Sequence, residues 1–397
     1  MKITDEIRER FPPIILLLAL LSAFPPLATD MYLPALPLLQ REWQAPLVAI
    51  NLTLVTFFMT YCGFLLIYGP LSDRYGRRPP LLAGVGLFIL SCLVCGLSQS
   101  AGMMIFGRVL QGAGAAAASA IVFAVCKDLF AGQQRQRVFI QIGVIVATAP
   151  MIAPMLGAWI IKLFSWRCIF LLQAVLGTLA LIGVWCMAES RRDDAPPSFQ
   201  EVAFSYFRLL RNRGYILLLL TLTCTCVPIF AFIGGSADLY ITQFGYDERQ
   251  FGYFFGFNSL AFVLAPLTFS RLVRRFATTR LMPVAFFGML FSSLLLLCPW
   301  IPQPWRLTLP MFFLTFSFAL CRPAGNNLIL EQVDRDTGAA SSLMVFSYFM
   351  IGALSMWFFS WDWHDKIVVL GRMGVVSVAC TLLLWQVVKR GLRPVSG

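Results

Sequence analysis

Two side chains of opposite charge stand inside long apolar stretches, where they could hold each other or exchange a proton. Asp30 lies in the apolar run 12–35 and Arg108 in the apolar run 103–126. At 1.5 Å per residue, Asp30 lies roughly 9 Å and Arg108 roughly 8 Å from the predicted outer ends. Because an unpaired charge at that depth is costly, we expect an ion pair that protonation of Asp30 would weaken. A static pair that only joins two helices is the alternative interpretation.

A second polar group lies in the apolar run 307–330. Arg322 is roughly 13 Å inside it, and Asn326 and Asn327 follow in a stretch that also contains Pro and Gly. Such a stretch should face a cavity, where Arg322 could bind an anionic or carbonyl-bearing substrate. Pairing with a backbone carbonyl or with another half-buried polar group is the alternative. Asp238, near the end of another run, is either a substrate contact or a solvated helix cap.

Further candidates for a binding cavity are amide and phenol side chains. Gln111 lies one turn from Arg108 on the same helix face and could bind a substrate or Asp30. Tyr32, Tyr61 and Asn258 complete the predicted substrate site. For each of the aromatic residues, ordinary helix packing is the alternative.

The remaining chemistry-bearing residues point to no enzyme or metal site. His364 is the one histidine, and the 11 cysteines lie almost entirely in apolar runs without metal-ligand spacing. The nucleotide-binding pattern G-x-x-x-x-G-K-[ST] does not occur, so we expect no cofactor and no use of ATP. An intramembrane enzyme or a receptor-like structural protein is the competing class, and it would need a nucleophile and base that this sequence does not supply.

The composition requires a membrane. Of 397 residues, 59% are hydrophobic and only 13% are charged, which leaves too few polar residues to cover a soluble protein. A membrane helix needs about 20 mostly apolar residues. Twelve stretches meet that need: 12–35, 47–70, 79–98, 103–126, 137–160, 165–188, 214–240, 250–272, 281–300, 307–330, 339–361 and 367–388.

The net charge of +12 follows from topology. With both termini placed in the cytoplasm, 22 of the 31 Lys and Arg residues lie in cytoplasmic segments, six in outer segments and three inside spans. This asymmetry obeys the positive-inside rule, so nucleic acid is not needed to explain the charge. We therefore expect an all-α membrane protein with both termini in the cytoplasm.

The chain divides near its midpoint. The polar stretch 189–213 predicts a cytoplasmic linker between two six-helix bundles, residues 1–188 and 214–397. Arginine-rich segments at 69–79 and 265–280 occupy matching places and indicate a weak internal repeat of the kind found in transporters.

Several segments resemble a known transporter family. The sequence GPLSDRYGRRP at 69–79 resembles the hallmark loop of the major facilitator superfamily. Residues 108–114 resemble the R-x-x-Q-G motif of its drug:proton antiporters, and residues 149–159 resemble their antiporter motif, here with Pro150, Pro154 and Gly157. Similarity to the bicyclomycin-resistance (Bcr/CflA) group is carried by residues 29–37, 251–254 and 337–343.

This resemblance implies two pseudo-symmetric bundles, alternating access, and proton-driven efflux of small organic molecules such as bicyclomycin, phenicol or sulfonamide drugs. It also implies that Asp73 latches the halves when the protein faces outward, although a purely topogenic charge cluster is the alternative. In the antiporter motif, the prolines should bend the helix and Gly157 should let a neighbour approach. The implied gate residues are Gly69, Asp73, Arg74, Gly76, Arg77 and Arg78.

Two other transport modes remain open, and Arg322 motivates both. One is dedicated export of an anionic metabolite or siderophore, and the other is uptake by proton symport. In every case we expect a monomer whose partners are protons, a small-molecule substrate and lipid.

Overall fold

The structure is a computed structural model that describes residues 11–190, 199–333 and 336–389. The described residues form helices and no strand. Their bounds are α2 (Phe11–Ser22), α3 (Phe24–Asp30), η1 (Leu33–Ala35), α4 (Leu36–Glu42), α5 (Leu47–Tyr75), α6 (Arg78–Gly96), α7 (Ala101–Leu129), α8 (Gly132–Leu163), α9 (Arg167–Cys186), α10 (Phe199–Arg211), α11 (Arg213–Cys224), α12 (Cys226–Ala237), η2 (Asp238–Gln243), α13 (Glu248–Leu272), α14 (Thr278–Leu296), α15 (Trp305–Glu331), α16 (Thr337–Phe359) and α17 (Lys366–Lys389).

Each of the twelve predicted stretches coincides with helix. Within the described part, ten helices are long and apolar enough to cross a membrane. The first predicted span is a pair of helical segments, Ile14–Ser22 and Phe24–Glu42, bent by 40°. The ninth is the shorter apolar helix Arg280–Leu296.

The break in the first span has a local cause. Pro25 and Pro26 stand in the first turn of α3, and a proline there cannot donate a hydrogen bond back to the preceding helix. The carbonyls just before the break are therefore without their usual helical partners. The break leaves the end of α3, with Asp30, as a separate helix terminus in the middle of the chain's first span.

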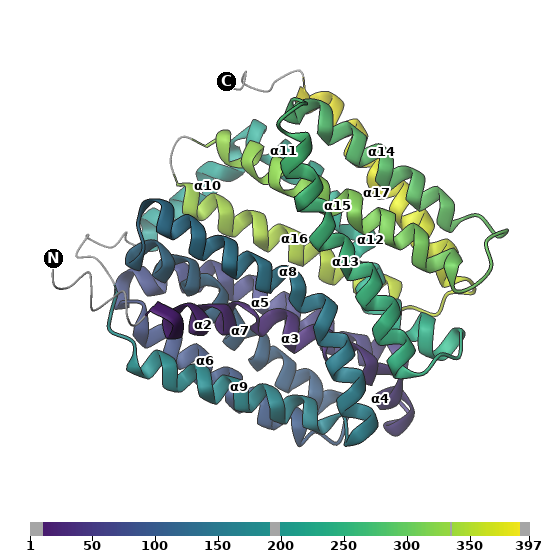
Figure 1. Ribbon diagram of the computed structural model, residues 1–397, viewed down its shortest axis with the longest axis horizontal. Helices are drawn as coiled ribbons and strands as arrows, with labels where there is room; N and C mark the ends of the chain where they lie inside the picture. Colours follow the sequence, from purple (N-terminus) through teal and green to yellow (C-terminus); the bar gives the residue numbers. More distant parts are fainter. Residues whose placement is uncertain (1–10, 191–198, 334–335, 390–397) are drawn as a thin grey trace.

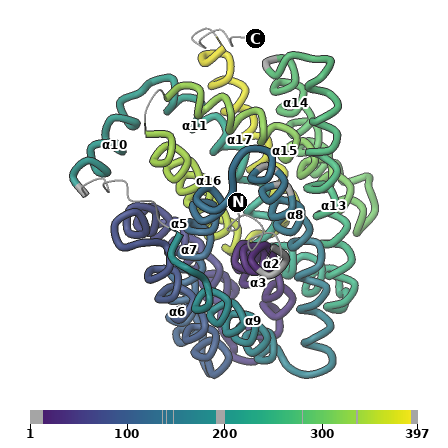
Figure 2. The backbone as a smooth tube through the Cα atoms, turned by 60° about the vertical axis from the view of Figure 1, so that its left-hand side comes forward, coloured from purple at the N-terminus to yellow at the C-terminus, as the bar shows by residue number. Residues whose placement is uncertain are grey.

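The helices form two groups on either side of a central interface (Figure 1). In the first group α7 packs against both α5 and α6, and α6 packs against α9. In the second group α15 packs against both α13 and α14, and α14 packs against α17. Two long contacts join the groups: α8 lies beside α13, as Figure 2 shows, and α5 lies beside α16. The assignment of separate domains to residues 1–188 and 214–397 remains a prediction.

The two ends of the molecule differ. We call the end that carries α10 the linker end and the opposite end the far end. At the far end η1 and α4 of the first group contact α12 and η2 of the second, and Arg249 stacks on the Trp159 ring at 4.1 Å. At the linker end a cavity of about 1010 Å³ separates the end of α5 from α10 and the start of α16. The groups are thus closed against each other at the far end and held apart at the linker end.

The linker itself contains an amphipathic helix. On α10, the large apolar side chains Phe204, Phe207 and Leu210 are exposed, and Arg208 and Arg211 stack on the Phe204 and Phe207 rings. Apolar and basic side chains mixed in this way are typical of a helix that lies in a membrane interface. The predicted linker residues 191–198 lie outside the described residues.

Candidate functional site

A cavity of about 480 Å³ lies between the two groups, next to the linker-end cavity along α7 and α16. Aromatic and aliphatic side chains from both groups make most of its wall. Its polar side chains are Ser22, Thr29, Asp30, Tyr61 and Ser119 from the first group and Asn258, Ser259, Arg322, Asn326 and Tyr348 from the second. Of the described residues on this wall, Asp30 is the one carboxylic acid and Arg322 the one basic side chain.

Asp30 reaches this cavity because α3 ends there. Its side chain accepts a hydrogen bond from the Thr29 hydroxyl at 3.0 Å, and the residue is 7% exposed. Among the described residues no cation lies within ion-pair distance of it. The predicted ion pair between Asp30 and Arg108 is therefore wrong for this structure.

Arg108 bonds to backbone oxygens and an amide instead, and its buried Nη2 has no described partner. Its Nη1 donates to the Ala28 carbonyl at 2.8 Å and to Gln111, and its Nε donates to the Thr53 carbonyl at 3.4 Å. The Ala28 carbonyl is available because the Tyr32 amide, its usual helical donor, bonds to Thr29 O at the end of α3. The helix terminus thus replaces the carboxylate as the partner of the buried arginine.

Gln111 and Tyr32 belong to the buried setting of Arg108 and not to the cavity wall. Gln111 donates to Gln173 Oε1 at 2.8 Å, and Gln173 donates to the Leu27 carbonyl at 3.0 Å. The Tyr32 hydroxyl bonds to Thr53 Oγ1 at 3.1 Å, and its ring lies 4.9 Å from the Arg108 guanidinium. The network around Arg108 occupies their polar groups, and neither residue lines the central cavity; their role as substrate contacts stays a prediction.

Gln173 is a member of this network that the sequence analysis missed. It is 1% exposed and joins α9 to α7 and to the end of α2–α3 through amide hydrogen bonds. A lone amide inside the apolar run 165–188 was the available signal, since a polar group there must find a buried partner.

Arg322 faces the cavity as predicted. Its guanidinium lies 3.9 Å from the Tyr348 ring centre and 4.2 Å from that of Phe318, and its Nη2 donates to Cys226 Sγ at 2.6 Å. Its Nη1 is buried without a hydrogen-bond partner. Of the alternative partners, no backbone carbonyl is among its described contacts, whereas the Cys226 thiol is a polar side-chain partner; binding of substrate by Arg322 stays a prediction.

The other predicted substrate contacts separate into two sets. Tyr61, Asn258 and Asn326 lie on the cavity wall, where Asn258 accepts from Thr315 and Asn326 accepts from Tyr348, each at 3.1 Å. Asn327 is exposed and donates to Glu331 at 2.7 Å, so its prediction as a cavity residue is wrong.

Asp238 has a role that neither interpretation foresaw. It forms a buried ion pair with Lys366 at 2.7 Å, with side-chain exposures of 8% and 7%. It is absent from the wall of the central cavity. The solvated cap is therefore wrong, because Asp238 is buried and paired with Lys366 at the start of α17; a contact with substrate stays a prediction.

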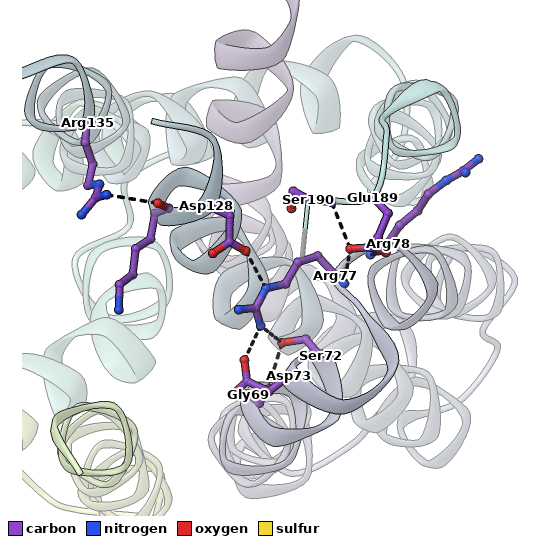
Figure 3. Close-up of polar contacts among 10 residues, drawn as sticks. Gly69, Ser72, Asp73, Arg77, Arg78, Asp128, Arg135, Glu189 and Ser190 are labelled. Atoms are coloured by element: carbon purple, nitrogen blue, oxygen red, sulfur yellow. Dashed lines mark hydrogen bonds and ion pairs between the residues drawn. The ribbon is translucent and has the colours of Figure 1, made fainter. Parts of the chain in front are cut away.

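The hallmark segment forms a charge cluster at the linker end (Figure 3). Arg77 lies between the Asp73 carboxylate, the Ser72 hydroxyl and Asp128 of α7, the last at 2.9 Å. Burial lowers the pKa of the Arg77 guanidinium, but Asp128 and Asp73 outweigh it and raise that pKa above its usual value. Arg77 therefore stays charged and ties α5 to α7 within the first group.

Glu189 completes the cluster from the end of the sixth predicted span. It accepts from the backbone amides of Arg77 at 2.7 Å and Arg78 at 3.0 Å, which are free donors at the start of α6. Gly76 has a φ of +92°, and a Cβ there would overlap the Glu189 carboxylate. This position requires glycine for both reasons.

Two more of the predicted gate residues border the linker-end cavity, and two others stack on aromatic rings. Gly69 and Asp73 line it, and the Asp73 side chain is 44% exposed. Arg74 lies over the Tyr75 ring at 5.7 Å, and Arg78 stacks on the Trp185 ring of α9 at 5.5 Å.

The antiporter segment forms part of the contact between the groups. Pro150 and Pro154 stand inside α8, which runs unbroken from Gly132 to Leu163. Because Pro154 has no amide hydrogen, the Pro150 carbonyl lacks its helical donor, and Ser259 of α13 donates to it at 3.1 Å. Gly157 lies directly against the Met31 carbonyl of the first span.

The comparisons with known proteins agree with this architecture. The profile of the Major Facilitator Superfamily matches residues 18–356. The chain belongs to this superfamily. It is therefore a multi-pass membrane transporter of small molecules and not an enzyme, and the predicted family and fold class are confirmed.

Relatives carry names from drug resistance. The chain is 26% identical to the bicyclomycin resistance protein homolog of Haemophilus influenzae over 345 residues, which cover 86% of this chain and 87% of the relative. It is 27% identical to multidrug resistance protein D of Escherichia coli over 345 residues, covering 85% and 86%.

Solved structures share the fold. A D-xylose-proton symporter superposes with a TM-score of 0.74 at 18% identity, covering 94% of this chain and 97% of the other. A bacterial homolog of the human lysosomal transporter Spinster, inward-facing and unoccupied, gives 0.72 at 12% identity, covering 96% and 98%.

Proposed function

We propose that this transporter exports small organic molecules in exchange for protons by alternating access. The observation that carries the proposal is a carboxyl group, Asp30, on the wall of a cavity between two helix groups, with no described cation beside it. A titratable group on the wall of a transport cavity is a functional-site candidate. The names of the drug-resistance relatives support small drugs as substrates.

The linker end faces the cytoplasm of a bacterial inner membrane in this proposal. The 22-to-6 distribution of basic residues supports this orientation. The structure, closed at the far end and separated at the linker end, then corresponds to a state that receives substrate from the cytoplasm.

Coupling arises because substrate and proton compete at Asp30. A bound substrate that contacts the carboxylate is displaced when a proton neutralises it, and each then favours a different state of the transporter. Arg108 contributes as a positioning residue. It donates a hydrogen bond to the Ala28 carbonyl, two residues before Asp30, and so fixes the end of α3.

The hallmark cluster acts as the cytoplasmic gate. Asp73 lines the space between α5 and the start of α16, and closure of that space would bring its carboxylate toward the α16 N-terminus, where a negative charge is favourable. Arg77 is fixed by Asp128 and, through its ion pair with Asp73, keeps that carboxylate in position for the contact. The protein acts as a monomer, since each monomer contains a complete cavity.

Dedicated export of an anionic metabolite is the second candidate, favoured by the unpartnered Nη1 of Arg322.

A susceptibility panel in a bacterial host without its own pumps distinguishes drug export from export of a dedicated metabolite. Resistance to chemically unrelated drugs is expected for the wild type and should be lost in Asp30→Asn. The exposed Asp362 gives a matched control, because Asp362→Asn also removes one carboxylate and should keep resistance. Wild-type protein at the membrane without any resistance would contradict drug export and favour the metabolite.

A further inference from the structure

The two charged side chains on the cavity wall come from opposite halves of the transporter. Asp30 ends α3 of the first group, and Arg322 stands within α15 of the second. No ion pair joins them among the described contacts. Each charge is therefore free to meet a group of a molecule that lies between them.

Arg322 is held in place by its neighbours, but one of its N–H donors has no acceptor. The Tyr348 and Phe318 rings hold its guanidinium, and Cys226 accepts from Nη2. A buried charged N–H without an acceptor is costly, so the unpartnered Nη1 leaves a strong preference for an incoming oxygen. The planar guanidinium suits a carboxylate best.

Aromatic rings lie on the wall with the two charges. Phe58 stacks on Phe349 with ring centres 5.4 Å apart, and Phe230 meets both rings edge-on at 5.6 Å and 5.5 Å. The volume of about 480 Å³ lies in the usual range for small-molecule sites. These rings pack on one another and together give the wall an apolar aromatic surface, against which a flat apolar body could lie.

Charge balance decides which substrates suit proton exchange. A purely anionic molecule would bind Arg322 better when Asp30 is protonated, so it would bind together with the proton and not against it. A purely cationic molecule would be repelled by Arg322. A molecule with both charges avoids both problems, because a proton on Asp30 removes the partner of its positive end and leaves Arg322 to repel that end.

We propose that the cavity binds zwitterionic aromatic molecules, with the ammonium group at Asp30 and the carboxylate at Arg322. The proposal deepens the proton-exchange function above and rests on it. The helices packed against α3 include α7 and α8, and the cation on them that bonds to α3 is Arg108, which is occupied by the Ala28 carbonyl. The ammonium group thus meets Asp30 without a competing described salt bridge.

The test measures binding to the purified full chain in detergent, without a proton gradient. The probes are the dipeptide phenylalanylphenylalanine, its N-acetyl form, its methyl ester, and the doubly blocked neutral form, each titrated by calorimetry. We expect the zwitterion to bind about tenfold or more tightly than the other three, the order expected of one charge-assisted hydrogen bond.

Substitutions of the two charged residues test which group of the probe each one binds. Arg322→Gln should abolish the advantage that the carboxylate gives the zwitterion and leave the neutral probe unchanged, and Asp30→Asn should abolish the advantage that the ammonium group gives it. Arg372→Gln, which removes an exposed cation of α17 outside the cavity, should match the wild type. Unfolding temperatures of all variants report whether they are folded, and Arg322→Lys should restore part of the carboxylate preference if Arg322→Gln unfolds.

Equal affinities for the four probes, no binding of any of them, or tightest binding of the N-acetyl anion would overturn the proposal. So would an Arg322→Gln variant that weakens all four probes equally, since that is the signature of a structural role. Because the assay involves no transport, a failure of proton-coupled export would leave these binding ratios intact, and the two failures can be told apart.

Discussion

At the scale of single residues, Arg108 shows how a buried cation is held without an acid beside it. Its contacts are backbone carbonyls, the Gln111 amide, and the faces of the Tyr32 and Phe57 rings, the latter at 4.5 Å. Its Nη2 has no described acceptor, whereas the Gln111 amide continues the chain of hydrogen bonds to Gln173. Gln173 provides the last acceptor in that chain.

Gln173→Leu should therefore destabilise the protein. It would leave the Gln111 amide without its 2.8 Å acceptor and the Leu27 carbonyl without its donor, at a cost of about 1–3 kcal/mol. The unfolding temperature in detergent measures this loss. Gln141→Leu, at an exposed position of α8, is the control and should change little. Equal unfolding temperatures for the two variants would count against the network.

The sequence identified these residues better than it identified their partners. Depth along a helix gave Asp30 and Arg108 matched positions, but depth does not fix the direction in which a side chain points or reveal a free carbonyl at a helix end. Asp238 was misjudged because its partner Lys366 was placed in a loop, one residue before the predicted span. Arg322 and Asn326 were placed correctly, because a polar stretch inside an apolar run must face a cavity.

At the scale of elements, close approach of backbones matters most where the first span meets α8. A side chain at Gly157 would overlap the Met31 carbonyl, one residue after Asp30. This contact fixes the chain that carries the coupling carboxylate. The sequence resemblance pointed to Gly157 but not to its neighbour, because a neighbour on a different helix depends on the broken first span.

Gly157→Ala should cost about 1–3 kcal/mol, the usual range for forcing extra volume into a packed site, and should reduce export. Gly143→Ala is the matched control on the same helix, since a Cβ there meets open space and alanine favours helix. Unfolding temperature and export activity of both variants give the measurement. Comparable losses at the two positions would show that Met31 is not the limiting contact.

At the scale of the whole molecule, the structure is a transporter closed at the far end and separated at the linker end. The twelve apolar stretches were predictable, because the length of each apolar run can be counted directly in the sequence. Which end of the molecule is open was not predictable, since the same residues must serve both states of an alternating-access cycle. The first span also extends to Glu42, beyond the predicted 12–35, because prolines break it into segments without ending it.

Proton-driven exchange in proteoliposomes tests the central claim most directly. The protein is reconstituted, an acidic lumen is imposed, and uptake of a labelled drug from the susceptibility panel is followed with and without a proton ionophore. We predict that the wild type accumulates drug only while the pH gradient lasts. Asp30→Asn should still exchange labelled for unlabelled drug but should not accumulate it. Accumulation by Asp30→Asn at the wild-type level, or accumulation only when the outer solution is the acidic side, would contradict proton exchange through Asp30.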